Sequence, residues 1–341
     1  MQQSILSYLF PKIGVDLGSH FLRLCTAENA RVVESSTCIA VNAQNGMVMA
    51  FGQEAAEMEG KVGEWVHVRW PVQNGIVSDP DLLKKLLQQL MQKERLIGFF
   101  SSPTVLVSVP VDSTVVQREM VAQVFQSVGC REVLTIAQPL AASIGAGVPI
   151  ADSSGSLIVH TGSDRMEAAL IALGSVVKCE TKLKAGRFFE ESIVNILREH
   201  FSLAVSHTTV RAIIANGISV KEEYKKKMHI QGKDVHSGKP ISVEVSGSIF
   251  QPLAVEITET CSAAINSVLM QVPPELTADI MQKGILLSGG LAQLRGLAAV
   301  VSETVELPVA VIEEPETAVI RGIHTGLQYL GAFKESIGYG N

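Results

Sequence analysis

The chain has 341 residues, of which 47% are hydrophobic and 18% charged, and its formal net charge at pH 7 is −6. This composition excludes a disordered chain, because apolar residues are plentiful and the charged share is below the usual value of about 25%. The acidic balance argues against nonspecific nucleic-acid binding, and the length predicts roughly two domains. The low charge also indicates that part of the surface faces a partner or a lipid.

The chain begins with an apolar stripe. If residues 1–11 form a helix, one face carries four large apolar side chains, which is typical of a weak amphipathic membrane anchor: Ile5, Leu6, Leu9 and Phe10. A frayed tail is the alternative, because the segment is short and has no lysine or arginine in its first ten residues. The same residues lack the basic region and cleavage site of a secretory signal.

Short apolar runs then alternate with helical patterns, which predicts the α/β class. Buried strands are expected at residues 13–17, 104–109, 133–136, 157–159 and 285–287. Helices are expected at residues 113–126, 187–200 and 253–270, with Ser113 as the N-cap of the first. No apolar run reaches the ~18 residues of a membrane-spanning helix. Five scattered cysteines without a C-x-x-C pair are expected to be reduced, buried thiols of a cytosolic protein: Cys25, Cys38, Cys130, Cys179 and Cys261.

A second apolar feature lies in a connecting segment. Leu96, Ile97, Phe99 and Phe100 follow a predicted helix and precede a predicted strand. Connecting loops usually face water, so four large apolar residues there favour contact with a membrane. The alternative is that Leu96 and Ile97 simply close the core. Two weak anchors repeated along a polymer would act together by avidity.

Two short segments about half a chain apart resemble each other. Residues 15–19 read V-D-L-G-S and residues 159–163 read V-H-T-G-S, and each lies between two predicted strands. Glycine lets a phosphate approach the backbone, while amides and a serine hydroxyl can donate hydrogen bonds to its oxygens. The pair therefore predicts two similar α/β domains, each with a phosphate-binding turn.

Longer segments make the chain similar to a known family. Residues 133–150, 273–297 and 313–322 read VLTIAQPLAASIGAGVPI, PPELTADIMQKGILLSGGLAQLRGL and EEPETAVIRG, and residues 71–79 also match. With the two turns, they resemble the actin/heat-shock chaperone/sugar kinase superfamily and, within it, the MreB family of bacterial actins. The resemblance runs from about residue 13 to residue 330.

The resemblance implies an actin-like fold, with two lobes around a nucleotide cleft and a large and a small subdomain in each. Lobe I is expected at residues 12–150, with its small subdomain at about 32–74. Lobe II is expected at residues 151–318, with its small subdomain at about 182–251. Residues 319–341 are expected to form a C-terminal helix that returns to lobe I, followed by a tail.

In this family the phosphates of ATP or ADP lie between the two turns, and acidic groups hold magnesium through water. Carried over by motif, Asp16 is the metal residue. The expected nucleotide-binding residues are Asp16, Gly18, Ser19, Gly162, Ser163, Gly186, Gly289 and Gly290.

Several expected acids are absent. His160 stands where the family has the aspartate of the second turn, and imidazole is a poor ligand for magnesium. Gln117 stands at the water-activating glutamate and Gln138 at a second glutamate, and an amide cannot act as a base at neutral pH. These three degenerate catalytic positions predict that ATP hydrolysis is weak or lost. Further departures from the pattern are His20, Phe21, Leu22, Arg187, Ile213, Ala215 and Leu291.

The resemblance implies a polymerising cytoskeletal protein at the inner face of the cytoplasmic membrane, which organises cell shape or envelope growth. Its expected partners are further copies of itself, the membrane, and a standard MreB or envelope-synthesis proteins, but not nucleic acid. One rival is an active ATPase filament in which Asp16, Asp164 and Gln117 hold magnesium and water. The other rival is an adaptor that does not polymerise and instead joins a standard MreB.

Overall fold

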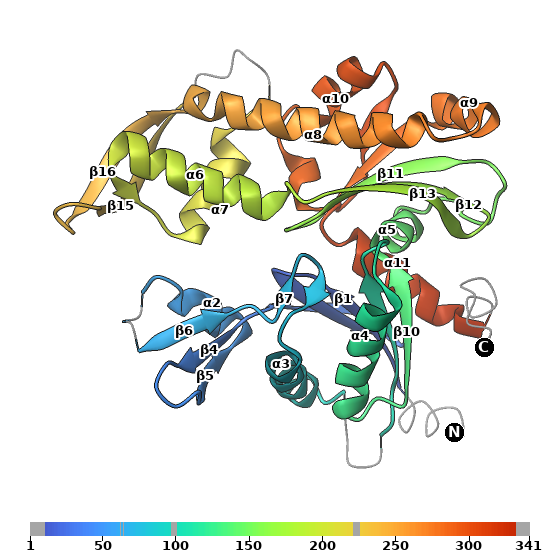
Figure 1. Cartoon of the computed structure of the whole chain (residues 1–341), viewed down its shortest axis with the longest axis horizontal. Helices are drawn as coiled ribbons and strands as arrows, with labels where there is room; N and C mark the ends of the chain where they lie inside the picture. The colour runs from blue at the N-terminus through green and yellow to red at the C-terminus, as the bar shows by residue number, and fades with distance from the viewer. Residues whose placement is uncertain (1–10, 62, 64, 97–100, 221–225, 332–341) are drawn as a thin grey trace. The chain divides into compact units, whose positions relative to one another are not determined.

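The computed structural model describes residues 11–61, 63, 65–96, 101–220 and 226–331. The chain forms two compact units, each of which combines sheets with helices (Figure 1). Unit 1 consists of Met1–Asp152, Ala172–Val176 and Thr317–Asn341, and unit 2 consists of Ser153–Ile171 and Val177–Glu316. The predicted α/β class is confirmed.

Unit 1 contains a five-stranded sheet in the order β10-β9-β1-β2-β3. Strands β1 and β2 are antiparallel, as are β2 and β3, while β1, β9 and β10 run parallel. The strands are β1 (Lys12–Leu17), β2 (Phe21–Thr26), β3 (Asn29–Ser36), β9 (Thr104–Val109) and β10 (Glu132–Ala137). Every residue of β9 is buried, as expected for the centre of such a sheet.

Helices cover this sheet because their apolar positions repeat with helical spacing. Helix α3 (Pro80–Lys93) starts where the Asp79 carboxylate accepts a hydrogen bond from the Leu82 amide at 3.0 Å, and it buries one stripe. That stripe is Leu82, Leu83, Leu86, Leu87, Leu90 and Met91. The other main helices of unit 1 are α4 (Val115–Ser127), α5 (Gln138–Gly145) and α11 (Ala318–Gln328).

Helices α5 and α11 lie side by side in unit 1 (Figure 1). Glycines permit this close approach. A Cβ atom on Gly322 would overlap the carbonyl oxygen of Ala141, and one on Gly145 would overlap that of Ala318. The backbone of each helix therefore fills the space that a side chain would take on the other.

Unit 2 contains a five-stranded sheet in the order β13-β12-β11-β17-β18. Its strands are β11 (Ser156–Thr161), β12 (Met166–Ala172), β13 (Ser175–Lys182), β17 (Ile285–Ser288) and β18 (Val309–Val311). Helix α8 (Gln251–Leu269) packs beside α6 (Gly186–Phe201) and α10 (Leu297–Val305) (Figure 1). The remaining helices are α7 (His207–Gly217) and α9 (Pro274–Lys283).

The two five-stranded sheets share one plan. Read in reverse, β18-β17-β11-β12-β13 matches β10-β9-β1-β2-β3. Strands β11 and β12 are antiparallel like β1 and β2, and β11, β17 and β18 are parallel like β1, β9 and β10. The internal similarity that the two turns suggested therefore extends to whole sheets.

Each unit also carries a three-stranded sheet. In unit 1 it joins β4 (Ile39–Asn42), β5 (Val48–Phe51) and β6 (Val66–Arg69), covered by α2 (Gly52–Met58). In unit 2 it joins β14 (Leu203–Ala204), β15 (Lys227–Asp234) and β16 (Pro240–Ser246). A two-stranded ribbon pairs β7 (Val72–Gln73) with β8 (Ile76–Val77). The predicted subdomain boundaries at 32–74 and 182–251 stay predictions.

The predicted strands and helices are present, with ends shifted by one or two residues. One local prediction is wrong: Thr114, not Ser113, caps helix α4, because the Thr114 hydroxyl accepts the Gln117 amide. The Ser113 hydroxyl donates instead to the Pro110 carbonyl at 2.7 Å. Within the described residues, no helix is both long enough and apolar enough to cross a membrane.

Candidate functional site

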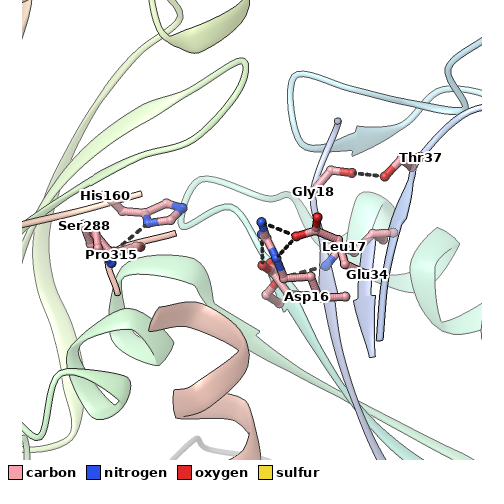
Figure 2. Close-up of polar contacts among 10 residues, drawn as sticks. Asp16, Leu17, Gly18, Glu34, Thr37, His160, Ser288 and Pro315 are labelled. Atoms are coloured by element: carbon pink, nitrogen blue, oxygen red, sulfur yellow. Dashed lines mark hydrogen bonds and ion pairs between the residues drawn. The ribbon is translucent and has the colours of Figure 1, made fainter. Parts of the chain in front are cut away.

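The first turn is a tight connection from β1 to β2. Leu17 pairs with Leu22, residues 18–20 connect the two strands, and the Gly18 amide donates to the Phe21 carbonyl at 3.0 Å. A Cβ atom on Gly18 would lie 2.5 Å from that same oxygen. The Gly18 carbonyl accepts a hydrogen bond from the Thr37 hydroxyl at 2.9 Å (Figure 2). Gly18 is therefore required by the turn itself.

The side chains of this turn contact the chain's own groups. The Ser19 hydroxyl is buried and accepts a hydrogen bond from the Gly75 amide at 2.9 Å. The His20 ring stacks on Trp70, with centroids 4.8 Å apart. Leu22, one of the departures from the family pattern, points into the core of unit 1 and not toward the turn.

Asp16, at the end of β1, is buried and held at both carboxylate oxygens. The Ser108 hydroxyl donates to Oδ1 at 2.8 Å, and the Arg23 guanidinium lies 3.5 Å from Oδ2. Burial raises the pKa of Asp16 above its ordinary value, and Arg23 and Ser108 only partly offset this effect. Arg23 also contacts Glu34, with Nε and Nη2 each 2.8 Å from Oε2.

The second turn repeats the geometry of the first. Thr161 pairs with Met166, residues 162–165 form the loop, and the Gly162 amide donates to the Arg165 carbonyl at 2.7 Å. The amides of Gly186 and Arg187, at the start of α6, donate to the carbonyls of Gly162 and Ser163. These bonds tie the turn to the helix within unit 2.

His160, the residue in place of the expected aspartate, is buried beside Ser288. Its Nδ1 lies 3.2 Å from the Ser288 hydroxyl oxygen, and that hydroxyl also donates to the Pro315 carbonyl at 3.3 Å (Figure 2). A hydroxyl has one hydrogen, so when Ser288 donates it to Pro315, the contact with His160 requires the ring proton on Nδ1. A neutral ring with its proton on Nδ1 carries its lone pair on Nε2, and an imidazole nitrogen is a poor ligand for magnesium.

Asp164, the displaced carboxylate of the active-ATPase rival, is paired inside unit 2. The Arg187 Nε donates to its Oδ1 at 2.8 Å, and the Ser163 hydroxyl donates to the same oxygen at 3.1 Å. Ser163 and Asp164 thus bind each other and Arg187.

The two glutamines have different surroundings. Gln117 is the third residue of α4, and its side-chain oxygen accepts the Thr114 amide at 2.9 Å, which completes a capping box. Gln138 is buried at the first position of α5. Gln117 therefore stabilises a helix end in this structure.

Gly289 and Gly290, the last two of the expected nucleotide-binding glycines, have different surroundings. Gly289 has φ +87°, its amide donates to the Pro315 carbonyl at 2.7 Å, and a Cβ atom would overlap the Thr161 carbonyl. A Cβ atom on Gly290 would meet no described heavy atom within 4 Å. Leu291, one of the departures from the family pattern, points into the core of unit 2. Gly290 is thus the expected glycine that leaves room for a ligand.

These donor groups do not fit a magnesium ion. Magnesium takes near-ideal octahedral oxygen coordination that includes carboxylates. Asp16 and Asp164 are each paired with an arginine, and the described residues contain no group of three His, Cys, Asp or Glu that could hold a metal. Of the expected nucleotide-binding glycines, Gly290 is the one beside which no described heavy atom lies within 4 Å of a Cβ position.

Of the residues predicted to contact a membrane, the structure describes Leu96. Ile5, Leu6, Leu9, Phe10, Ile97, Phe99 and Phe100 lie outside the described residues. Leu96 is half-buried and packs against the core of unit 1, so it supports the alternative that it closes the core.

Arg23, Ser108 and Ser288 did not emerge from the sequence as site residues. For Arg23 a signal existed, because a hairpin closed by Leu17 and Leu22 must set Asp16 opposite Arg23. For Ser108 and Ser288 no local signal existed, since each reaches its partner from a strand more than 90 residues away in the chain.

Comparison with known proteins shows which family this sequence matches. A family model described as MreB/Mbl protein matches residues 11–335. The cell shape-determining protein Mbl of Bacillus subtilis (strain 168) is 29% identical over 312 residues, covering 91% of this chain and 93% of that protein. The cell shape-determining protein MreB of Escherichia coli (strain K12) is 31% identical over 317 residues, covering 91% of each.

Solved structures agree on the fold. MreB5 of Spiroplasma citri bound to AMPPNP superposes with a TM-score of 0.88 at 24% identity, covering 96% of this chain and 98% of that one. The MamK double helical filament has a TM-score of 0.71 at 21% identity, covering 94% and 98%. The predicted actin-like fold is confirmed. Because the family model spans almost the whole chain and a relative exceeds 30% identity across it, this chain belongs to the MreB/Mbl family.

Proposed function

We propose that this chain is a filament subunit that organises cell shape or envelope growth, and that its ATP hydrolysis is weak or lost. The relatives named above support the first part, since they are cell shape-determining proteins and one structural neighbour is a double helical filament. One observation carries the second part: the Asp16 carboxylate is paired with Arg23 and Ser108 instead of being open to a metal ion.

Two assays on the purified chain test this proposal. Concentration-dependent pelleting is expected for a filament subunit, and an adaptor that does not polymerise would stay in the supernatant. Phosphate release from ATP and magnesium is expected at the level of the Asp16→Asn variant. Brisk release by the unmodified chain that Asp16→Asn abolishes would establish the active-ATPase rival instead.

ATP or ADP remains the proposed ligand, as in MreB5 of Spiroplasma citri, which was crystallised with AMPPNP and with ADP. Gly290 supplies a clean test because a methyl group there meets no described atom of the chain. Gly290→Ala should keep the melting temperature without nucleotide and lose the rise that ATP produces. Gly331→Ala, which also meets no described atom, is the matched control and should keep that rise. An unchanged rise in Gly290→Ala would remove Gly290 from the site.

A peripheral position on the inner face of the cytoplasmic membrane is the last part of the proposal. It is supported by the apolar residues Ile97, Phe99 and Phe100 and by the stripe of residues 1–11. Pelleting with anionic lipid vesicles should fall when Phe99 and Phe100 are changed to serine. A Leu96→Ser variant controls for lost core packing, because Leu96 contacts the core of unit 1. Unchanged binding of the Phe99 and Phe100 variant would refute the role of that loop.

A further inference from the structure

We propose that the Arg23 guanidinium takes the place of a divalent metal ion beside Asp16, so that the carboxylate at the first turn has a cationic partner without magnesium. The inference rests on the proposed function, because it concerns the turn that the family resemblance assigns to the nucleotide phosphates. It goes further by naming the side chain that excludes the metal.

The sheet itself aims Arg23 at Asp16. Asp16, Arg23 and Glu34 are directly opposite one another on the neighbouring strands β1, β2 and β3. Opposite residues of antiparallel strands project from the same face, with their Cβ atoms about 5 Å apart. Leu22 and Leu24, on either side of Arg23, project to the other face and are buried in the core. The arginine is thus fixed by strand register and not by a loop.

The contacts leave no carboxylate oxygen of Asp16 without a partner. Oδ1 accepts the Ser108 hydroxyl at 2.8 Å, and Oδ2 faces the Arg23 guanidinium at 3.5 Å. The side chains of Arg23 and Asp16 are only 12% and 8% exposed, so solvent screens their attraction weakly. A divalent ion would have to share the carboxylate with the guanidinium, which repels it by like charge and is itself held at 2.8 Å by Glu34.

The charges of Arg23, Asp16 and Glu34 argue against phosphate binding by Arg23. One guanidinium faces two carboxylates, Asp16 and Glu34, so this cluster has no surplus positive charge for a phosphate. Arg23 therefore replaces the metal as the partner of Asp16 and not as a new phosphate ligand. The chain keeps a satisfied carboxylate at the turn whatever the magnesium concentration.

The test is thermal unfolding of the full chain in millimolar MgCl2 or in EDTA, with and without ATP. The unmodified chain should melt at the same temperature in MgCl2 and EDTA, and any rise with ATP should be equal in both. Arg23→Leu leaves a buried carboxylate without its cation, so it should melt lower, and MgCl2 should then raise its melting temperature by about 2 °C. Adding Asp16→Asn to Arg23→Leu should abolish that rise.

Arg31→Leu is the matched control, because Arg31 is 72% exposed, pairs with Glu94 at 4.0 Å and should give no response to magnesium. Arg23→Lys retains a cation and should also stay insensitive. Magnesium dependence in the unmodified chain would overturn the inference, and this readout decides the matter even if Arg23→Leu does not fold. A folded Arg23→Leu without a magnesium response would overturn it as well. The pelleting assay fails or succeeds separately, so loss of this inference would leave the filament proposal standing.

Discussion

At the scale of single residues, both aspartates near the two turns stand beside arginines. Arg23 faces Asp16 in unit 1, and Arg187 faces Asp164 in unit 2. A buried carboxylate is costly unless it is paired, so each arginine stabilises a group that would otherwise need another cation. In each unit, therefore, the aspartate near the turn belongs to an internal ion pair.

Gln117 gives the first prediction at this scale. Glutamate is as good as glutamine in a capping box, so Gln117→Glu should change the free energy of unfolding by less than about 0.5 kcal/mol. Gln117→Ala should cost about 1 kcal/mol, because the bond to the Thr114 amide is lost. Urea unfolding measures both.

Gln117→Glu should also leave phosphate release slow, because a base alone does not restore the metal. A large increase in release by Gln117→Glu would show that the glutamine was the only catalytic defect. Gln117→Ala serves as the control for changes in the helix end.

The cysteines give a prediction about pH. Burial raises the pKa of the thiols of Cys25, Cys38, Cys130 and Cys261 from 9.0 to about 12, whereas Cys179 is half-buried. In the native chain at pH 8, iodoacetamide should therefore modify Cys179 first and the other four only after unfolding. Mass spectrometry of labelled peptides measures the order, and rapid native labelling of Cys261 would contradict it.

The same raised thiol pKa values predict that the folded chain becomes less stable at alkaline pH. The unfolded thiols ionise near pH 9 and the folded ones near pH 12, so the folded chain holds more protons in this window. Stability is thus fully present below pH 9 and falls as the pH rises toward 12, by roughly 1 kcal/mol for each thiol at pH 10.

At the scale of elements, the crossing of α5 and α11 should be sensitive to a single methyl group. Gly322→Ala would press its Cβ atom into the Ala141 carbonyl and should cost about 1–3 kcal/mol as the helices move apart. Gly331→Ala is the control, because its Cβ atom meets nothing described within 4 Å. Urea unfolding compares the two, and equal stability of the variants would show that the crossing tolerates displacement.

Most elements of the fold were predictable, because strands such as Leu157–Val159 and helices such as α8 show their periodicity in the sequence. The cap of α4 was not, since Ser113 and Thr114 are both good N-caps and only the reciprocal bond to Gln117 distinguishes them. The close packing of α5 on α11 was also hidden, because Gly145 and Gly322 look like ordinary helix glycines until the two helices are brought together.

The sequence shows which residues of the candidate site differ from the family pattern, but it does not show which residues contact them. The residue types at Gln117, Gln138 and His160 were readable from the family motifs. The contacts of Asp16 and His160 were not readable, because Ser108 and Ser288 lie on strands distant in the chain. Glycine roles were ambiguous for the same reason: Gly18 and Gly289 serve tight backbone contacts, whereas only the structure sets Gly290 apart.

At the scale of the whole molecule, the two units share one sheet plan and one turn but differ in a side chain near the end of strands β1 and β11. Unit 1 retains Asp16 and pairs it with Arg23, while unit 2 has His160 in place of an acid. The strand order and the turn glycines persist in both. The framework of the sheets and turns is thus shared by both units, and the difference between them lies in these side chains.

The proposed filament with weak or lost hydrolysis predicts how the amount of polymer changes over time. If hydrolysis is weak or lost, filaments formed with ATP and magnesium should persist as long as filaments formed with AMPPNP, because no chemical step changes the bound nucleotide. Pelleted protein measured over hours, with phosphate release recorded in the same samples, checks this expectation. A sample without nucleotide shows how much assembly needs no ligand. A pellet that declines with ATP as phosphate appears, but not with AMPPNP, would mean that the residues left in the two units still catalyse the reaction.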